Sequence, residues 1–289
     1  MEKTYTYLRD LRIRDKLFLA VFMFISICML AAGWFFWGEQ SLAVIISLMI
    51  AVLLTVQIFY YRRNQRRVQE MHEDLYNQNN NHYRQIESMF SIFSVLKINR
   101  PLPPMGVWSV EPDFLSHLTT LILSERPALI LEASSGVSTL VSSYCLKKLG
   151  LGSIVSLEHE EGYARKCQRA IREHELEDIA TVLHAPLKEH EIKGKSWMWY
   201  DTSQIEKIGV IDMMIVDGPP RNIQRQSRYP AVPLLIEKMK EHALLILDDG
   251  RQDDIKEMAA MWQDEFQCFE CETIKSKNEI IVLRKIAKK

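Results

Sequence analysis

The sequence has little net charge and few cysteines. Its 36 lysine and arginine residues are balanced by 37 acidic residues, which gives a net charge of −1. This balance predicts no nucleic acid partner, because nucleic acid binding requires a basic surface. The five cysteines do not suggest a disulfide framework. Cys268 and Cys271 look like half of a zinc site, but the chain has no second pair to complete it.

Two stretches near the N-terminus lack charged residues altogether. Residues 17–37 and 41–61 are charge-free runs separated by three residues. At about 1.5 Å per residue, each spans the roughly 30 Å hydrocarbon core of a bilayer. Basic residues flank the pair but are absent from the link, which predicts two cytoplasmic ends. We expect a transmembrane helical hairpin in the inner membrane, with the rest of the chain cytoplasmic; a cleaved signal is the alternative for the first run.

A helical stalk is expected between the membrane and the rest of the chain. Its interrupted heptad pattern consists of Val68, Met71, Leu75, Gln78, His82, Gln85, Met89, Ile92 and Leu96. A coiled coil, and with it a homo-oligomer through the stalk, is one option. The asparagine-rich run 77–81 favours a break, and the prolines of 100–104 begin a globular domain. The predicted parts are a cytoplasmic segment 1–16, the hairpin 17–61, the stalk 62–98 and the domain 99–289.

The domain lacks the G-x-G-x-x-G fingerprint of dinucleotide-binding folds. Its apolar run 128–132 ends in an acid and is followed by a turn with one glycine, Gly136, and then by a helix. Recognition of a pyrophosphate is therefore poorly supported, which also argues against a nucleotide-sugar transferase. The next apolar run, 154–157, ends in Glu158, and a carboxylate in this position suits ribose hydroxyls. The pattern favours a nucleoside without phosphates.

Six short motifs follow one another in the domain. They are Leu131–Thr139, Ser156–Glu160, Trp199–Asp201, Val216–Pro220, Arg228–Pro230 and Leu247–Asp249. Together they resemble the class I methyltransferases that use S-adenosylmethionine, in particular a bacterial branch with the patterns LExGSGxST, VDGPP, RYP and LDD. The resemblance spans roughly residues 100–285. It implies an α/β fold with a Rossmann-like, doubly wound, seven-stranded and mainly parallel sheet, whose last strands would be 266–273 and 279–284.

The resemblance also implies a binding site for S-adenosylmethionine. The first turn would hold the methionine part, Glu158 the ribose, and His159 and Ala185 the adenine, while Asp217 would face the methyl donor. The cofactor-binding residues expected in this way are Glu132, Ser134, Gly136, Ser138, Thr139, Glu158, His159, Ala185 and Asp217. Ser134 stands where the family has glycine, so a positive φ at this position would be strained.

Acidic residues end two further apolar runs. Asp217 follows residues 211–216, and Asp248 and Asp249 follow residues 243–247. A hydroxyl acceptor needs a base or a metal ion. The three carboxylates suit Mg²⁺ or another divalent cation, an arrangement that resembles the metal-dependent catechol-type methyltransferases. In the metal-free alternative, Asp217 or Asp249 is the base or anchors the acceptor. The candidate catalytic residues are Asp217, Asp249 and Arg228.

The acceptor is less well defined by the sequence. Arg221, Arg225 and Arg228 suit an anionic acceptor or form a solvated basic loop. The sequence thus predicts a membrane-anchored methyltransferase that acts on an oxygen atom of a glycan, a lipid-linked intermediate or a small metabolite at the cytoplasmic face. The alternative is a catalytically inactive cofactor-binding or scaffold domain tethered to the bilayer.

Overall fold

The computed structural model of the chain describes residues 39–105 and 110–286, together with residues 24–25, 27–28, 31–32 and 35. The chain divides into two compact units, Met1–Gln78 and Asn79–Lys289. The predicted segment 1–16 and most of the first predicted span lie outside the described residues. The hairpin therefore stays a prediction.

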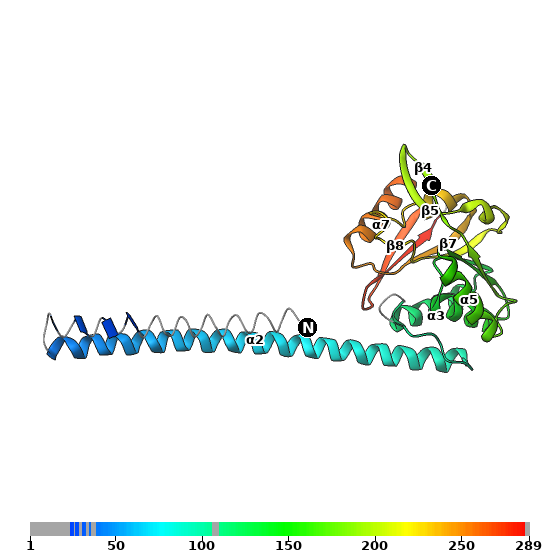
Figure 1. The fold of residues 1–289 in the computed structure, drawn as a ribbon. Coiled ribbons are helices and arrows are strands. Elements are labelled where there is room, and N and C mark those ends of the chain that lie inside the picture. The colour runs from blue at the N-terminus through cyan, green and yellow to red at the C-terminus, as the bar shows by residue number, and fades with distance from the viewer. Residues whose placement is uncertain are drawn as a thin grey trace. The chain divides into compact units, whose positions relative to one another are not determined.

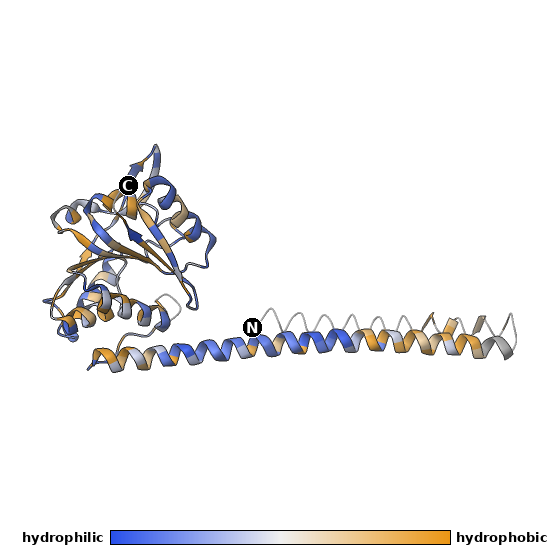
Figure 2. Cartoon of the chain, turned by 180° about the vertical axis from the view of Figure 1, so that it is seen from behind, coloured by the Kyte–Doolittle hydropathy of each residue, from blue (hydrophilic) through white to orange (hydrophobic). Residues whose placement is uncertain are grey.

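Helix α2 (Glu39–Leu96) is one continuous helix of 58 residues. Among the described residues it is the one helix that is long and apolar enough to cross a membrane. Figure 2 shows its apolar beginning and its hydrophilic middle. The helix continues through Asn77–Asn81, so the break that the sequence favours there is not observed.

The second unit is built around a sheet with helices packed against it (Figure 1). The sheet has seven strands in the order β3-β2-β1-β6-β7-β9-β8. Its strands are β1 (Leu129–Ala133), β2 (Ser153–Glu158), β3 (Ala180–His184), β6 (Ile211–Val216), β7 (Met239–Leu247), β8 (Phe269–Ile274) and β9 (Ile280–Lys285). The first five are parallel to one another, whereas β9 pairs antiparallel with both β7 and β8. The predicted Rossmann-like, mainly parallel sheet of seven strands is confirmed. The seventh strand in the order, β8, begins three residues later than predicted, because α7 continues to Phe266.

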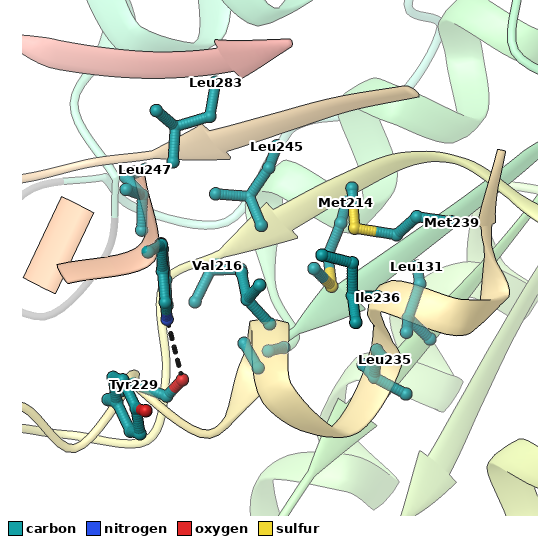
Figure 3. Close-up of a cluster of buried hydrophobic side chains, with 14 of the residues drawn as sticks. Leu131, Met214, Val216, Tyr229, Leu235, Ile236, Met239, Leu245, Leu247 and Leu283 are labelled. Carbon is teal, nitrogen blue, oxygen red and sulfur yellow. Dashed lines mark hydrogen bonds between the residues drawn. The ribbon is translucent and has the colours of Figure 1, made fainter. Parts of the chain in front are cut away.

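Buried side chains cover both faces of the sheet, as expected for a doubly wound fold. Ile130 and Leu131, which are neighbours on β1, belong to two different apolar clusters, because successive side chains of a strand point to opposite faces. One cluster includes residues of α3 (Pro112–Glu125), α4 (Val137–Leu149), α5 (Glu161–Glu173) and the end of α2. The other includes α7 (Asp253–Phe266) and the short helices α6 (Ala231–Leu235) and η2 (Ile236–Lys238), as Figure 3 shows in part.

The last turns of α2 belong to the globular unit. Ile92 and Leu96 are 1% and 5% exposed. The backbone N–H of Asp113 at the start of α3 donates a hydrogen bond to Gln85 Oε1 at 3.0 Å. Part of the heptad pattern predicted for an intermolecular stalk therefore serves packing within the chain.

A two-stranded hairpin that the sequence did not predict lies between β3 and β6. Strand β4 (Leu187–Ile192) pairs antiparallel with β5 (Lys195–Tyr200), and the short helix η1 (Thr202–Lys207) follows. Strand β4 has the sequence LKEHEI, with too few apolar residues to be recognised as a strand. Trp197, Trp199 and Tyr200 on β5 are at most 7% exposed, so these aromatic side chains pack in the core.

Candidate active site

The candidate site lies at the carboxyl edge of the parallel strands. Glu132 stands near the end of β1, Glu158 ends β2, and Asp217 and Asp248 directly follow β6 and β7. Since these four strands are neighbours in the sheet, their ends converge on one edge. The folding pattern thus brings together acidic residues that are up to 116 positions apart.

Glu132 is the centre of a hydroxyl cluster, which we define as Glu132, Ser138, Thr139 and Ser156. The carboxylate is fully buried. It accepts hydrogen bonds from Ser138, from Thr139 Oγ1 at 2.6 Å and from Ser156 Oγ at 2.7 Å. Thr139 Oγ1 also accepts a bond from the backbone N–H of Gly136 at 3.0 Å. The cluster therefore connects β1, β2 and the start of α4, and it fixes the turn between β1 and α4.

Burial decides the protonation of Glu132. It raises the pKa of this carboxyl group from 4.5 to about 7, although the hydrogen bonds from three hydroxyl groups lower it. Both carboxylate oxygens of Glu132 are occupied by hydroxyl donors. This geometry suits a residue that positions the turn. The predicted contacts of Glu132, Ser138 and Thr139 with a cofactor stay predictions.

The turn between β1 and α4 is strained at one residue. Ser134 has a φ of 142°, a conformation that favours glycine, as the departure from the family pattern led us to expect. Next to it, Ser135 Oγ donates a hydrogen bond to Glu158 Oε2 at 2.9 Å. A Cβ atom added to Gly136 would meet no atom within 4 Å, so the backbone of the turn borders open space.

Glu158 is held in place from several sides. Its Oε1 accepts a hydrogen bond from the backbone N–H of Glu160 at 3.0 Å and lies 3.1 Å from His159 Nδ1. Burial alone would raise the pKa of Glu158, but these contacts and the bond from Ser135 outweigh it and lower the pKa below its ordinary value. The contact with Glu158 also raises the pKa of His159. Ala185 lies next to the backbone of Glu158, because its N–H donates to the backbone carbonyl oxygen of Glu158 at 2.7 Å.

Arg228 is the centre of an arginine cluster, which we define as Asp217, Arg228, Asp248 and Asp249. Arg228 Nη2 lies 2.9 Å from Asp217 Oδ1 and 3.3 Å from Asp249 Oδ2. Its Nη1 donates to the backbone oxygen of Asp248 at 3.3 Å. The guanidinium group is 11% exposed, so it links the ends of β6 and β7 below the surface.

The carboxyl groups of this cluster differ in their environment. Asp248 is 5% exposed and accepts the backbone N–H of Asp249 at 2.8 Å. Burial, with the nearby Asp217 and Asp249, raises its pKa to about 8. Burial also raises the pKa of Asp217, against the lowering effect of Arg228. Asp248 therefore favours its neutral form at neutral pH, and Asp217 is a stronger base than an exposed aspartate.

The three aspartates do not fit the predicted metal site. A guanidinium group contacts two of them, Asp217 and Asp249, and the third, Asp248, is buried against the backbone. In the described part of the chain, no group of three His, Cys, Asp or Glu side chains is arranged to hold a metal ion. The metal-free alternative is the one that this geometry supports.

A cavity of about 390 Å³ adjoins the arginine cluster. The carboxylic residues along it are Glu111, Asp217, Asp248, Asp249 and Asp254, and the basic residues are Arg221 and Arg228. Both arginines have partners, because Arg221 Nη1 donates to Gln252 Oε1 at 3.0 Å and Arg228 contacts two aspartates. Arg225, the third predicted arginine, pairs with Glu257 at 2.5 Å. The lining is thus more acidic than the sequence suggested.

The sequence analysis missed two serines that complete the site. Ser156 and Ser135 bind Glu132 and Glu158, respectively. Ser156 is a small polar residue between apolar residues of β2, directly opposite Glu132 in the parallel register and two positions before Glu158. Because side chains of a strand alternate between its two faces, Ser156 and Glu158 lie on the same face of β2. This spacing is the sequence pattern from which Ser156 could have been predicted as a site residue.

A family model described as a methyltransferase domain matches residues 133–250. The match begins at the end of β1 and ends just after Asp249, so it includes the turn, Glu158 and the arginine cluster. This part of the chain is similar to a methyltransferase domain, and the prediction of an enzyme of the methyltransferase class is confirmed. No curated protein matches the chain.

Several solved structures are similar to the chain. An O-methyltransferase from Bacillus cereus in complex with SAH has 18% identity, a TM-score of 0.47 and a match over 69% of this chain and 91% of its own. A methyltransferase from Podospora anserina bound to SAH has 12% identity, a TM-score of 0.49 and coverage of 69% and 88%. An O-methyltransferase from Streptomyces achromogenes in complex with SAM has 11% identity, a TM-score of 0.46 and coverage of 69% and 89%. The assignment of the fold rests on the strand order of the sheet rather than on these similarities.

Proposed function

We propose that the chain is an S-adenosylmethionine-dependent O-methyltransferase anchored in a membrane. The observation that carries the proposal is the hydrogen bond of 2.9 Å between Ser135 in the first turn and Glu158 at the end of β2. It joins the two parts of the chain that a nucleoside cofactor requires, a turn open to a ligand and a carboxylate for ribose hydroxyls.

The described residues fit such a cofactor. Open space borders the backbone at Gly136, where the methionine part would lie. Glu158 is kept in its anionic form by its lowered pKa, and its Oε2, which accepts the bond from Ser135, has a second lone pair for a ribose hydroxyl. His159 and Ala185 would flank the adenine from either side of Glu158. The cofactor supplies an activated methyl group, and the remaining steps fall to the chain itself.

The arginine cluster would manage the proton of the acceptor. A hydroxyl group is a poor nucleophile until it loses its proton, and a carboxylate with a raised pKa accepts that proton more readily. Asp217 meets this condition, because burial raises its pKa. Arg228 would hold Asp217 in position and stabilise its charge before the transfer, and Asp249, which contacts the same Nη2 atom of Arg228, is the second candidate base.

The cavity beside the cluster favours a neutral acceptor that carries hydroxyl groups. Without Asp248, which favours its neutral form, four carboxylic residues still outnumber the two arginines, so an anionic acceptor would meet repulsion there. Polar side chains such as Gln226, Ser227 and Asn278 also line it and could bind hydroxyl groups. Among the predicted acceptors, this composition supports a glycan over an anionic metabolite.

Membrane anchoring is proposed from the sequence of α2 and the residues before it. The apolar part of α2 meets the length and composition of a membrane span, and Arg62, Arg63, Arg66 and Arg67 follow it. An excess of basic residues marks the cytoplasmic side. We propose two spans, with the catalytic domain on the cytoplasmic face of the inner membrane.

Calorimetry with the full chain in detergent tests the cofactor site. We expect S-adenosylmethionine and S-adenosylhomocysteine to bind, and Glu158→Ala to weaken binding by roughly 10- to 100-fold, the cost of losing hydrogen bonds to a charged group. Glu161→Ala is the matched control, since its side chain is 60% exposed and pairs with Arg165 on the surface. A folded chain that binds neither compound would favour the scaffold alternative.

Fractionation of cells tests the anchor separately. We expect the chain to stay in the membrane pellet after washing with high salt and with alkaline carbonate, and to be released by detergent. Release by carbonate alone would contradict a transmembrane anchor without affecting the assignment of the cofactor site.

A further inference from the structure

One face of α2 carries an exposed apolar stripe in the part of the helix that belongs to the globular unit. Tyr83, Ile86, Phe90 and Phe93 are 70%, 55%, 70% and 36% exposed. With Asn79 before them, they follow one another at intervals of four, three, four and three residues. We call these five residues the seam. Such an interval pattern repeats every 3.5 residues, which is the repeat of a coiled coil rather than that of a helix lying on a globular core.

The seam does not point toward the domain of its own chain. The side of α2 that packs on the domain carries Gln85, Ile92 and Leu96. At about 100° per residue, the seam is centred roughly 120° around the helix from those residues. The heptad register expected from the sequence is therefore occupied within the chain at residues 85–96, and a second register is left exposed.

We propose that the seam binds the seam of a second copy of this chain in a parallel coiled coil. The helix is already formed over 58 residues, so association of two chains does not include the free-energy cost of forming it. The seam residues occupy the a and d positions, with Tyr83 and Phe90 at a, and with Asn79, Ile86 and Phe93 at d. Identical helices side by side would bury these aromatic and aliphatic side chains against one another.

The polar residues that flank the seam favour a parallel arrangement of identical chains. In this register His82 is at position g and Glu87 is at the following position e. In a parallel dimer the g residue of one helix lies beside the following e residue of the other, so His82 would face Glu87 in both pairs. In the sequence, Tyr76 lies three residues before Asn79 and continues the same spacing.

Cross-linking of the full chain in native membranes tests the interface. Cys28 and Cys271, the exposed cysteines among those described, are first replaced by serine. With an oxidant, Ile86→Cys should give a product of twice the chain mass, and Ser91→Cys, an exposed position outside the seam, should give at most a tenth as much. Equal cross-linking at both positions, no product at Ile86→Cys, or a product of another mass would overturn the proposal.

The mass of the full chain in detergent is a second, independent measurement. We expect two chains per particle, one chain for the double variant Ile86→Glu with Phe90→Glu, and two for the control Ser91→Glu. Circular dichroism should show the same helix content in all three, since the substituted side chains are exposed. A single chain per particle in the unmodified protein at every concentration would overturn the interface, whatever its methyltransferase activity.

Discussion

The hydroxyl cluster and the arginine cluster each surround one buried ionisable side chain, Glu132 and Arg228, but the partners are neutral in the first cluster and include carboxylates in the second. Glu132 is surrounded by three neutral hydroxyl groups, and it can become neutral itself by taking up a proton. Arg228 is surrounded by two carboxylates and a carbonyl oxygen, and it stays charged because a guanidinium group does not lose its proton in proteins. The first cluster should therefore respond to pH, and the second should respond to the loss of any charged partner.

The largest effect is expected when the arginine cluster loses its centre. Arg228→Gln leaves Asp217 and Asp249 without their counter-charge, and we expect a loss of about 4 kcal/mol in the free energy of unfolding, as for removal of one partner of a buried ion pair. Denaturant unfolding followed by tryptophan fluorescence measures it. Adding Asp217→Asn should recover part of the loss, since the two residues are coupled.

A matched control for Arg228 is available in the same loop. Arg225 pairs with Glu257 at 2.5 Å, but the two side chains are 73% and 46% exposed. Solvent screens such a pair, so Arg225→Gln should cost less than about 1 kcal/mol. Equal losses for the two variants would show that the buried cluster contributes nothing beyond a surface ion pair.

The two clusters also differ in how far the sequence predicts them. The acids at the ends of β1, β2, β6 and β7 are recognisable because each follows an apolar run, and the convergence of parallel strands places them together. The strain at Ser134 follows from the missing glycine. The side chains that contact these acids are not predictable in this way. They lie 11 to 24 residues away along the chain, and no local pattern in the sequence indicates such pairs. The metal hypothesis is not supported because Arg228 contacts two of the three aspartates. No local pattern in the sequence indicates this contact.

A smaller effect is expected for the pH response of the hydroxyl cluster. The folded chain holds the proton of Glu132 up to about pH 7, whereas the unfolded chain releases it near the ordinary pKa of 4.5. The folded state thus binds more protons between these values, and its stability falls as the pH rises across this window. The loss should reach roughly 3 kcal/mol, at about 1.4 kcal/mol per pKa unit.

Glu132→Gln removes this titration with little change in shape. Unfolding free energies measured at pH 5 and pH 8 should fall more steeply in the unmodified chain than in Glu132→Gln. Asp248, with its pKa of about 8, loses stability in the same direction in both proteins, so the difference between them isolates Glu132. Parallel pH profiles would mean that Glu132 is ionised in the folded chain at pH 5.

The smallest effect concerns the turn that links the hydroxyl cluster to Glu158. Ser134 holds a φ of 142°, which costs a residue with a Cβ atom more than it costs glycine. We expect Ser134→Gly to raise the free energy of unfolding by about 1 kcal/mol, the lower end of the cost of a strained backbone conformation. Ser134→Ala retains the Cβ atom and should bring no such gain. If alanine stabilises the fold as much as glycine does, the side chain of Ser134 rather than its backbone lowers the free energy of unfolding. The backbone of the turn would then not be strained.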